Sequence, residues 1–265
     1  APHLLFRIPF LVPVLKSKPF ARPFLELTET FFSAYDRYQP LKNGLPHLRL
    51  DGAELARVLP GLAQEAVGAV VFDEWGIDTH RLVAANALSA AEAGADILLG
   101  ERVQAVLRRP RGHVYGVRVF GAGGGIGREL TAHIVVNAAG AWAPALAGLA
   151  GQELQLRPGR GVHVIFGRRV TNHAVVVSAI DGRDVFLMPH GQSTWIGTTD
   201  DDHFGDPDDL SVTASEVEYL LSAVARLLPR VRQLPIIDTM VGLRPTLHQW
   251  GPNEDDLSRE HAVVD

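Results

Sequence analysis

The stretch V-V-N-A-A-G-A-W, residues 135–142, decides the fold that this sequence predicts. An apolar run ends at Val136, Asn137 and a series of small residues follow, and residues 143–149 are rich in alanine and leucine. This order predicts a strand, a tight turn and a helix. Because small residues let a backbone approach a cofactor closely, the stretch predicts an α/β protein with a ligand at the turn.

The residues before this stretch carry the pattern of paired strands. Apolar runs at 103–106, 114–120 and 130–136, separated by turns, predict a three-stranded antiparallel meander. The glycine-rich turn at 121–127 has some likeness to a dinucleotide-binding fingerprint, but Ile126 stands at the third glycine position and no helix follows. We therefore interpret this turn as a hairpin loop.

Helix signals occupy the preceding part of the chain. Asp78 is placed to cap an alanine-rich helix that ends near Ala93 and is stopped by Gly94. The apolar run 97–99 then predicts a buried parallel strand, and the small side chains of the helix are expected to lie close on a sheet.

The first eighty residues contain a second set of helix signals. Asp51 and Glu54 have the spacing of a capping box. After Pro23, aromatic and leucine side chains recur at helical spacing, which predicts a helix whose apolar stripe belongs to the core. The residues of that stripe are Phe24, Leu27, Phe31, Tyr35 and Tyr38.

Downstream of the deciding stretch the pattern becomes that of an antiparallel sheet. Strand-like runs lie at 162–166, 174–177, 185–188 and 194–197. A capping box that starts at Thr213 opens a helix with one apolar face, which is expected to pack on this sheet.

The composition is that of a folded protein and excludes several kinds of site. The 265 residues, 46% hydrophobic and 21% charged, allow one large domain or two interleaved ones. The absence of cysteine excludes thiolate metal sites, and a net charge of −5 argues against nucleic-acid binding. The acidic residues between 200 and 209 lack the glycine and glutamate of a calcium loop, so no metal site is expected.

The apolar opening of the chain, residues 4–15, is too short to span a bilayer and is interrupted by Pro9 and Pro13. It is either a buried segment or one that lies on a membrane surface. The sequence begins at Ala1 without a secretory signal and ends without a closing signal, so we expect it to be part of a longer protein.

Five motifs together resemble one family. They are V-V-N-A-A-G-A-W at 135–142, R-P-G-R-G-V-H at 157–163, I-G-T-T-D at 196–200, G-D-P at 205–207 and G-L-R-P at 242–245. In this order and spacing the chain resembles the FAD-dependent glycerol-3-phosphate dehydrogenases, which have a D-amino-acid-oxidase-like fold. Each motif is weak alone, but the set is specific and covers essentially the whole chain.

The resemblance implies a fold and a division into domains. It implies an α/β protein in which a partial FAD-binding, Rossmann-like domain with a β-meander is interleaved with an antiparallel-sheet substrate domain. The FAD-binding domain is expected at 73–156 and 242–265, and the substrate-binding domain at 1–72 and 157–241. Members of the family carry a Gly-x-Gly-x-x-Gly turn and a His-Gly-Gly stretch that would precede Ala1, so the chain is expected to be a fragment that is inactive by itself.

The resemblance also implies which residues contact the cofactor and the substrate. Cofactor contacts are implied for Val103, Ala138, Ala139, Gly140 and Gly242.

Three further residues carry the implied chemistry. Arg244 is implied beside the flavin and the substrate's secondary hydroxyl, where it stabilises an alkoxide-like oxygen. Arg259 is implied to bind the substrate phosphate. His163 is a candidate base, although a histidine in an apolar strand is more often a hydrogen-bonded core residue.

The implied activity is oxidation of glycerol 3-phosphate to dihydroxyacetone phosphate, with electrons passed to a quinone. The implied location is cytoplasmic, with peripheral attachment to the inner face of the cell membrane left open. Two alternatives also stay open. One is another FAD-dependent amine or 2-hydroxy-acid oxidase of the same fold, and the other is a non-catalytic fragment.

Overall fold

The computed structural model describes residues 2–62, 64–110, 112–121, 123–249, 251, 257–258, 260 and 262–264. The chain divides into two compact units that interleave along the sequence. Unit 1 comprises Ala1–Leu82, Gly161–Thr199 and Ser211–Val241, and unit 2 comprises Val83–Arg160, Asp200–Leu210 and Gly242–Asp265. The mixed α/β architecture confirms the predicted fold class. Which unit receives the cofactor and which the substrate stays a prediction.

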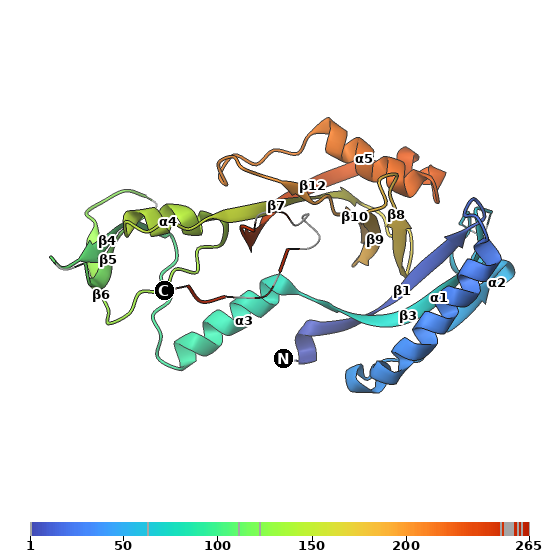
Figure 1. Ribbon diagram of the computed structural model, residues 1–265, viewed down its shortest axis with the longest axis horizontal. Helices are drawn as coiled ribbons and strands as arrows, with labels where there is room; N and C mark the ends of the chain where they lie inside the picture. Colours follow the sequence, from blue (N-terminus) through green and yellow to red (C-terminus); the bar gives the residue numbers. More distant parts are fainter. Residues whose placement is uncertain are drawn as a thin grey trace. The chain divides into compact units, whose positions relative to one another are not determined.

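Unit 1 is built on a large sheet whose strand order is β7-β10-β9-β8-β1-β3-β2 (Figure 1). All neighbouring pairs in this order are antiparallel except β1 and β8, which pair in parallel. The strands are β1 (Leu5–Leu15), β2 (Leu48–Asp51), β3 (Ala66–Ile77), β7 (Leu156–Phe166), β8 (Ala174–Ser178), β9 (Asp184–His190) and β10 (Ser193–Gly197). The four strands predicted between residues 162 and 197 are thereby confirmed.

The apolar opening of the chain forms β1, which follows a short 3₁₀ turn, η1 (Pro2–Leu4). Leu11 and Val14 are fully buried, and β1 lies between β3 and β8 in the sheet. Of the two alternatives for this segment, the structure therefore supports the buried one.

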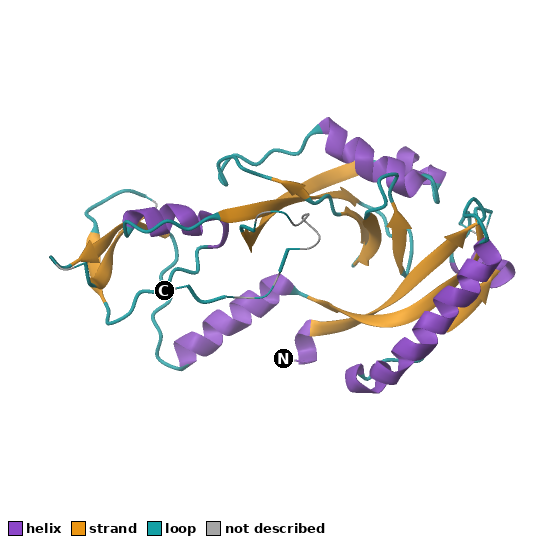
Figure 2. Cartoon of the chain, viewed as in Figure 1, coloured by secondary structure: helices purple, strands orange, loops and turns teal. Residues whose placement is uncertain are grey.

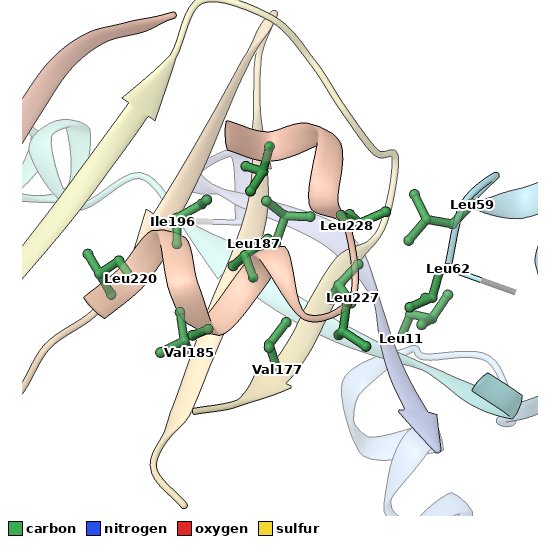
Figure 3. Packing of buried hydrophobic residues seen from close by; sticks show 14 of the residues in the cluster. Leu11, Leu59, Leu62, Val177, Val185, Leu187, Ile196, Leu220, Leu227 and Leu228 are labelled. Carbon is green, nitrogen blue, oxygen red and sulfur yellow. The ribbon is translucent and has the colours of Figure 1, made fainter. Parts of the chain in front are cut away.

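Helix α5 (Ala214–Ala225) covers one face of the sheet and encloses the main core of unit 1. The Thr213 hydroxyl accepts a hydrogen bond from the Glu216 amide, and the Glu216 carboxylate accepts one from the Thr213 amide, so the predicted capping box is confirmed. Leu220 and Leu227 belong to the same buried cluster as Leu187 of β9 (Figure 3). A short 3₁₀ helix, η4 (Pro229–Gln233), follows α5.

Helix α1 (Ala21–Tyr35) packs on the sheet through a different face from the one predicted. Leu25 and Phe32 are buried against Val14 and Val70. The predicted core stripe is instead mostly exposed, because Phe24, Leu27, Phe31 and Tyr38 all keep more than a third of their surface accessible. The apolar arc of α1 is wide and includes both sets of residues, so its periodicity could not show which part of the arc meets the sheet.

The other helical segments of unit 1 are η2 (Asp36–Lys42) and α2 (Gly52–Val58). The Asp51 side chain caps α2 and completes a capping box with Glu54, as predicted.

Unit 2 contains the predicted meander. Strands β4 (Glu101–Arg108), β5 (Val114–Gly121) and β6 (Arg128–Thr131) form a separate antiparallel sheet in the order β4-β5-β6 (Figure 1). β11 (Asp201–Asp202) belongs to this unit and pairs with β7 at Arg160 and Gly159, which are unit 2 residues of that strand. β12 (Ile236–Leu247), whose residues from Gly242 onwards belong to unit 2, also pairs with β7.

Helix α3 (Thr79–Glu92) has the predicted boundaries, but it does not pack as predicted. The Asp78 carboxylate accepts a hydrogen bond from the Arg81 amide, and Gly94 adopts a φ of 95°, which ends the helix. No residue of α3 is buried, so its alanine-rich face does not lie close on a sheet.

Two predicted strand segments are not strands. Residues 97–99 and 134–136 have loop conformations and exposed side chains, although the strand prediction for both rested on their apolar character. The segment that leaves α3 towards the meander is drawn as loop (Figure 2). An apolar run becomes a strand only where a neighbour satisfies its backbone N–H and C=O groups, and none of the described strands pairs with either run.

Among the described residues, no helix is long and apolar enough to cross a membrane.

Candidate functional site

The turn within residues 135–142 lies in unit 2. Two hydrogen bonds of the Asn137 side chain stabilise it. The side-chain amide donates to the Ala143 carbonyl at 2.9 Å, and the side-chain Oδ1 accepts from the Ala139 amide at 3.2 Å. The turn continues into η3 (Gly140–Trp142) and α4 (Ala143–Leu149), which confirms the predicted turn and helix. Gly140 has a φ of 56°, a conformation that favours glycine.

A cleft of about 940 Å³ lies beside this turn. Val103 of β4 and Ala139 of the turn both line it, so the structure brings together two of the residues predicted to bind the cofactor. Ala138 and Gly140 adjoin Ala139 in the chain but are not among the lining residues, and Gly242 belongs to β12.

The cleft combines apolar walls with an acidic side chain that sequence reasoning missed. Asp208 accepts a hydrogen bond from the Trp142 indole Nε1 at 3.0 Å and lies 3.7 Å from an Arg102 guanidinium nitrogen. Phe204 adds an exposed aromatic side chain to the lining. An aromatic, largely apolar cleft of this size suits a planar organic ligand.

Arg244 lies on β12 and is held by an acidic partner. Its Nη1 donates to Asp200 Oδ1 at 2.5 Å, and the side chains of Arg244 and Asp200 are 36% and 15% exposed. Of these two residues, the resemblance implied a role for Arg244 alone. Nothing local predicts the pair, because 44 residues separate its members.

A second arginine–aspartate pair lies beside the first. Arg157 of β7 donates from Nε and Nη2 to the two carboxylate oxygens of Asp202, each at 2.8 Å. The Thr246 hydroxyl of β12 donates to the Arg157 carbonyl. The cavity among these groups measures only about 10 Å³, so they pack closely on the side of Arg244 that faces them.

His163 belongs to unit 1, where β7 pairs with β10. It lies opposite Gly197 in the ladder, and a Cβ on Gly197 would come within 2.2 Å of the His163 ring. Burial lowers the pKa of His163 below its ordinary value, so the ring is neutral at neutral pH. A neutral imidazole is the form that accepts a proton.

One predicted site residue, Arg259, falls outside the described residues. Within the described part of the chain, no group of three or more histidine, aspartate or glutamate side chains is placed to hold a metal ion.

The family of this chain follows from a match to a family model. Residues 1–261 match the model described as FAD dependent oxidoreductase, also called DAO. The chain belongs to this family. FAD is the cofactor of these FAD-dependent oxidoreductases, as the resemblance implied.

Glycerol-3-phosphate dehydrogenases are among the relatives of this chain. The enzyme of Mycobacterium leprae is 32% identical over 269 residues, which cover 100% of this chain and 45% of that protein. The chain thus spans less than half the length of this relative.

Solved structures show the same fold. Glycerol-3-phosphate dehydrogenase from Bacillus halodurans, complexed with FAD, has a TM-score of 0.74 and 24% identity, with 94% of this chain and 45% of that chain covered. Glycine oxidase from Geobacillus kaustophilus has a TM-score of 0.62 and 24% identity, with 92% of this chain and 60% of that chain covered. The FAD-binding fold is therefore common to enzymes that are named for different substrates.

Proposed function

We propose that this chain belongs to an enzyme that oxidises sn-glycerol 3-phosphate to dihydroxyacetone phosphate with FAD and passes the electrons to a quinone. The observation that carries the proposal is the similarity to a glycerol-3-phosphate dehydrogenase, which extends over the whole chain. The fold alone would not carry it, because one fold serves several chemistries.

The cofactor role is assigned to the turn in unit 2 and its neighbours. Val103 and Ala139 line a cleft of suitable size, and nothing lies within 4 Å of the position a Cβ would take at Gly140 or Gly242. A ligand can therefore approach the backbone at these glycines without meeting a side chain. We assign FAD contacts to these residues and to Ala138.

The reaction roles follow from the chemistry of three side chains. Bound FAD supplies the acceptor for the hydride that leaves C2 of the substrate. Arg244 keeps its charge near neutral pH, so it stabilises the negative charge that grows on the C2 oxygen. His163, which is neutral, accepts the hydroxyl proton, and Arg259 binds the phosphate through its guanidinium fork.

The substrate assignment is tested on flavin-loaded protein that contains this chain. We expect reduction of a quinone analogue with glycerol 3-phosphate and little turnover of glycine, sarcosine or 2-hydroxyglutarate. Arg259→Ala should raise KM for glycerol 3-phosphate and spare kcat, because the phosphate keeps its charge throughout the reaction. The substitution should also reduce the preference of the enzyme for glycerol 3-phosphate over unphosphorylated glycerol. Steady-state kinetics with each substrate and acceptor measures all of these effects.

Two outcomes would contradict the assignment. Faster turnover of an amine or a 2-hydroxy acid would favour the alternative oxidase function, which the likeness to glycine oxidase supports. If Arg259→Ala discriminates against glycerol as strongly as the parent does, the phosphate-binding role assigned to Arg259 is wrong. The 265-residue chain by itself is expected to be inactive and serves as the blank.

We further propose that the protein is cytoplasmic and attaches peripherally to the anionic inner face of the cell membrane, where quinones reside. Helix α1 and the residue before it, Phe20, present an exposed apolar stripe. Phe20 is 83% exposed, and Leu27 and Phe31 are each 64% exposed. The Lys18 ammonium lies 4.3 Å from the centre of the Phe24 ring. Aromatic side chains beside basic ones are suited to an anionic lipid surface.

The membrane assignment predicts sedimentation with vesicles that contain phosphatidylglycerol, weakened by salt because charge contributes. Phe20→Ser and Phe31→Ser should lower the bound fraction. Ile180→Ser, at a site 91% exposed and away from α1 in the sequence, is the matched control and should leave it unchanged. Equal binding by all three variants, or none by the parent, would overturn the assignment.

A further inference from the structure

Two aspartates of one short segment each hold an arginine from a neighbouring strand of unit 2. Asp200 precedes β11 and pairs with Arg244 of β12, whereas Asp202 ends β11 and pairs with Arg157 of β7. Residues two apart in an extended segment point to the same side, which explains why both carboxylates reach this cluster.

Gly159 of β7 leaves the room that the Asp200–Arg244 pair needs. A Cβ at this position would lie 2.6 Å from Asp200 Oδ1 and 3.2 Å from Arg244 Nη1. β7 pairs with β11 here, since Gly159 lies opposite Asp202. The pair is therefore seated against the strand backbone.

The contact orients Arg244 and leaves part of it accessible. A long arginine side chain loses rotamer entropy when it is ordered. The bond to Asp200, whose own side chain is only 15% exposed, limits that freedom before any ligand binds. With 36% of its side chain exposed, Arg244 can still meet a ligand.

We propose that Asp200 is a positioning residue for Arg244: it fixes the guanidinium in the orientation from which Arg244 stabilises the developing oxyanion. This inference rests on the proposed reaction role of Arg244. Preorganised donors act most strongly where charge develops, so the loss of Asp200 should affect kcat more than KM.

The test uses flavin-loaded protein and a double-mutant cycle. Asp200→Asn removes the charge but keeps the shape, and a misdirected guanidinium should lower kcat by ~10–10²-fold while KM stays within a few-fold. In the Arg244→Ala background the same substitution should have almost no further effect, because nothing remains for Asp200 to orient. A residue with only a structural role would lower kcat by the same factor in both backgrounds.

Asp202→Asn is the matched control, since it removes the same charge from the same segment but from a different arginine. Any effect it has on kcat should be equal in the parent and in Arg244→Ala. Thermal unfolding of each variant checks that the fold is retained. Equal factors for Asp200→Asn in both backgrounds would overturn the proposal.

A structural readout separates this inference from the proposed function. Crystal structures should show one Arg244 conformer in the parent and in Asp202→Asn, and several or a displaced one in Asp200→Asn. If the parent does not oxidise glycerol 3-phosphate, the proposed function fails, and the cycle is repeated with whichever substrate is oxidised. An unmoved, single Arg244 conformer in Asp200→Asn would refute the positioning role whatever the substrate.

Discussion

Arg244→Ala is expected to lower kcat for glycerol 3-phosphate by ~10²–10³-fold, the range typical of removing one oxyanion-type donor. The guanidinium stays charged, and its stabilising effect grows as the hydride leaves and the C2 oxygen gains negative charge. An interaction that strengthens in the transition state appears in kcat rather than in KM. Steady-state kinetics on flavin-loaded protein measures the effect.

A surface arginine provides the control for this substitution. Arg232 forms an exposed ion pair with Glu218 in unit 1, so Arg232→Ala should leave kcat within a few-fold of the parent. Both variants must retain flavin, which absorbance spectra verify. If Arg244→Ala keeps its kcat within a few-fold as well, the role assigned to this arginine is wrong.

Phe166→Ala is expected to lower the free energy of unfolding by about 3–5 kcal/mol. Phe166 ends β7, is fully buried and is the largest of the fully buried side chains in the described core. Its removal leaves a cavity beside Val164 and Ile196, whose strands cannot close on it without breaking the sheet register. Urea denaturation of the purified protein gives the change from the midpoint and slope.

The same residue type on the surface serves as the reference. Phe20 is 83% exposed, and Phe20→Ala should change the free energy of unfolding by less than about 0.5 kcal/mol. A loss below about 1 kcal/mol for Phe166→Ala would mean that this part of the sheet is not packed as the structure shows.

The local elements of the fold were predictable from short stretches of sequence. The caps at Asp51 and Thr213, the stop at Gly94 and the meander strands depend on neighbours a few residues away, so their signals are complete in the sequence. The family was likewise recognisable, because its motifs keep their order and spacing along the chain.

Packing was predicted less well. α1 has one wide apolar arc, and only the sheet beneath it decides that Leu25 and Phe32 face inwards. The apolar runs at 97–99 and 134–136 have strand-like composition, yet a strand exists only with a pairing partner.

For the candidate site, the sequence by itself determined which side chains are candidates for binding and catalysis. The arginine in G-L-R-P and the small residues of the 137–140 turn are identified by residue type and local context. Only the tertiary structure decided what surrounds these residues. It places the Asp200 carboxylate against Arg244, leaves space for this pair at Gly159, and brings Val103 and Ala139 together in the lining of one cleft. The physical reason is that hydrogen bonds and ion pairs depend on distances of a few ångströms, which strand pairing sets between residues far apart in the chain.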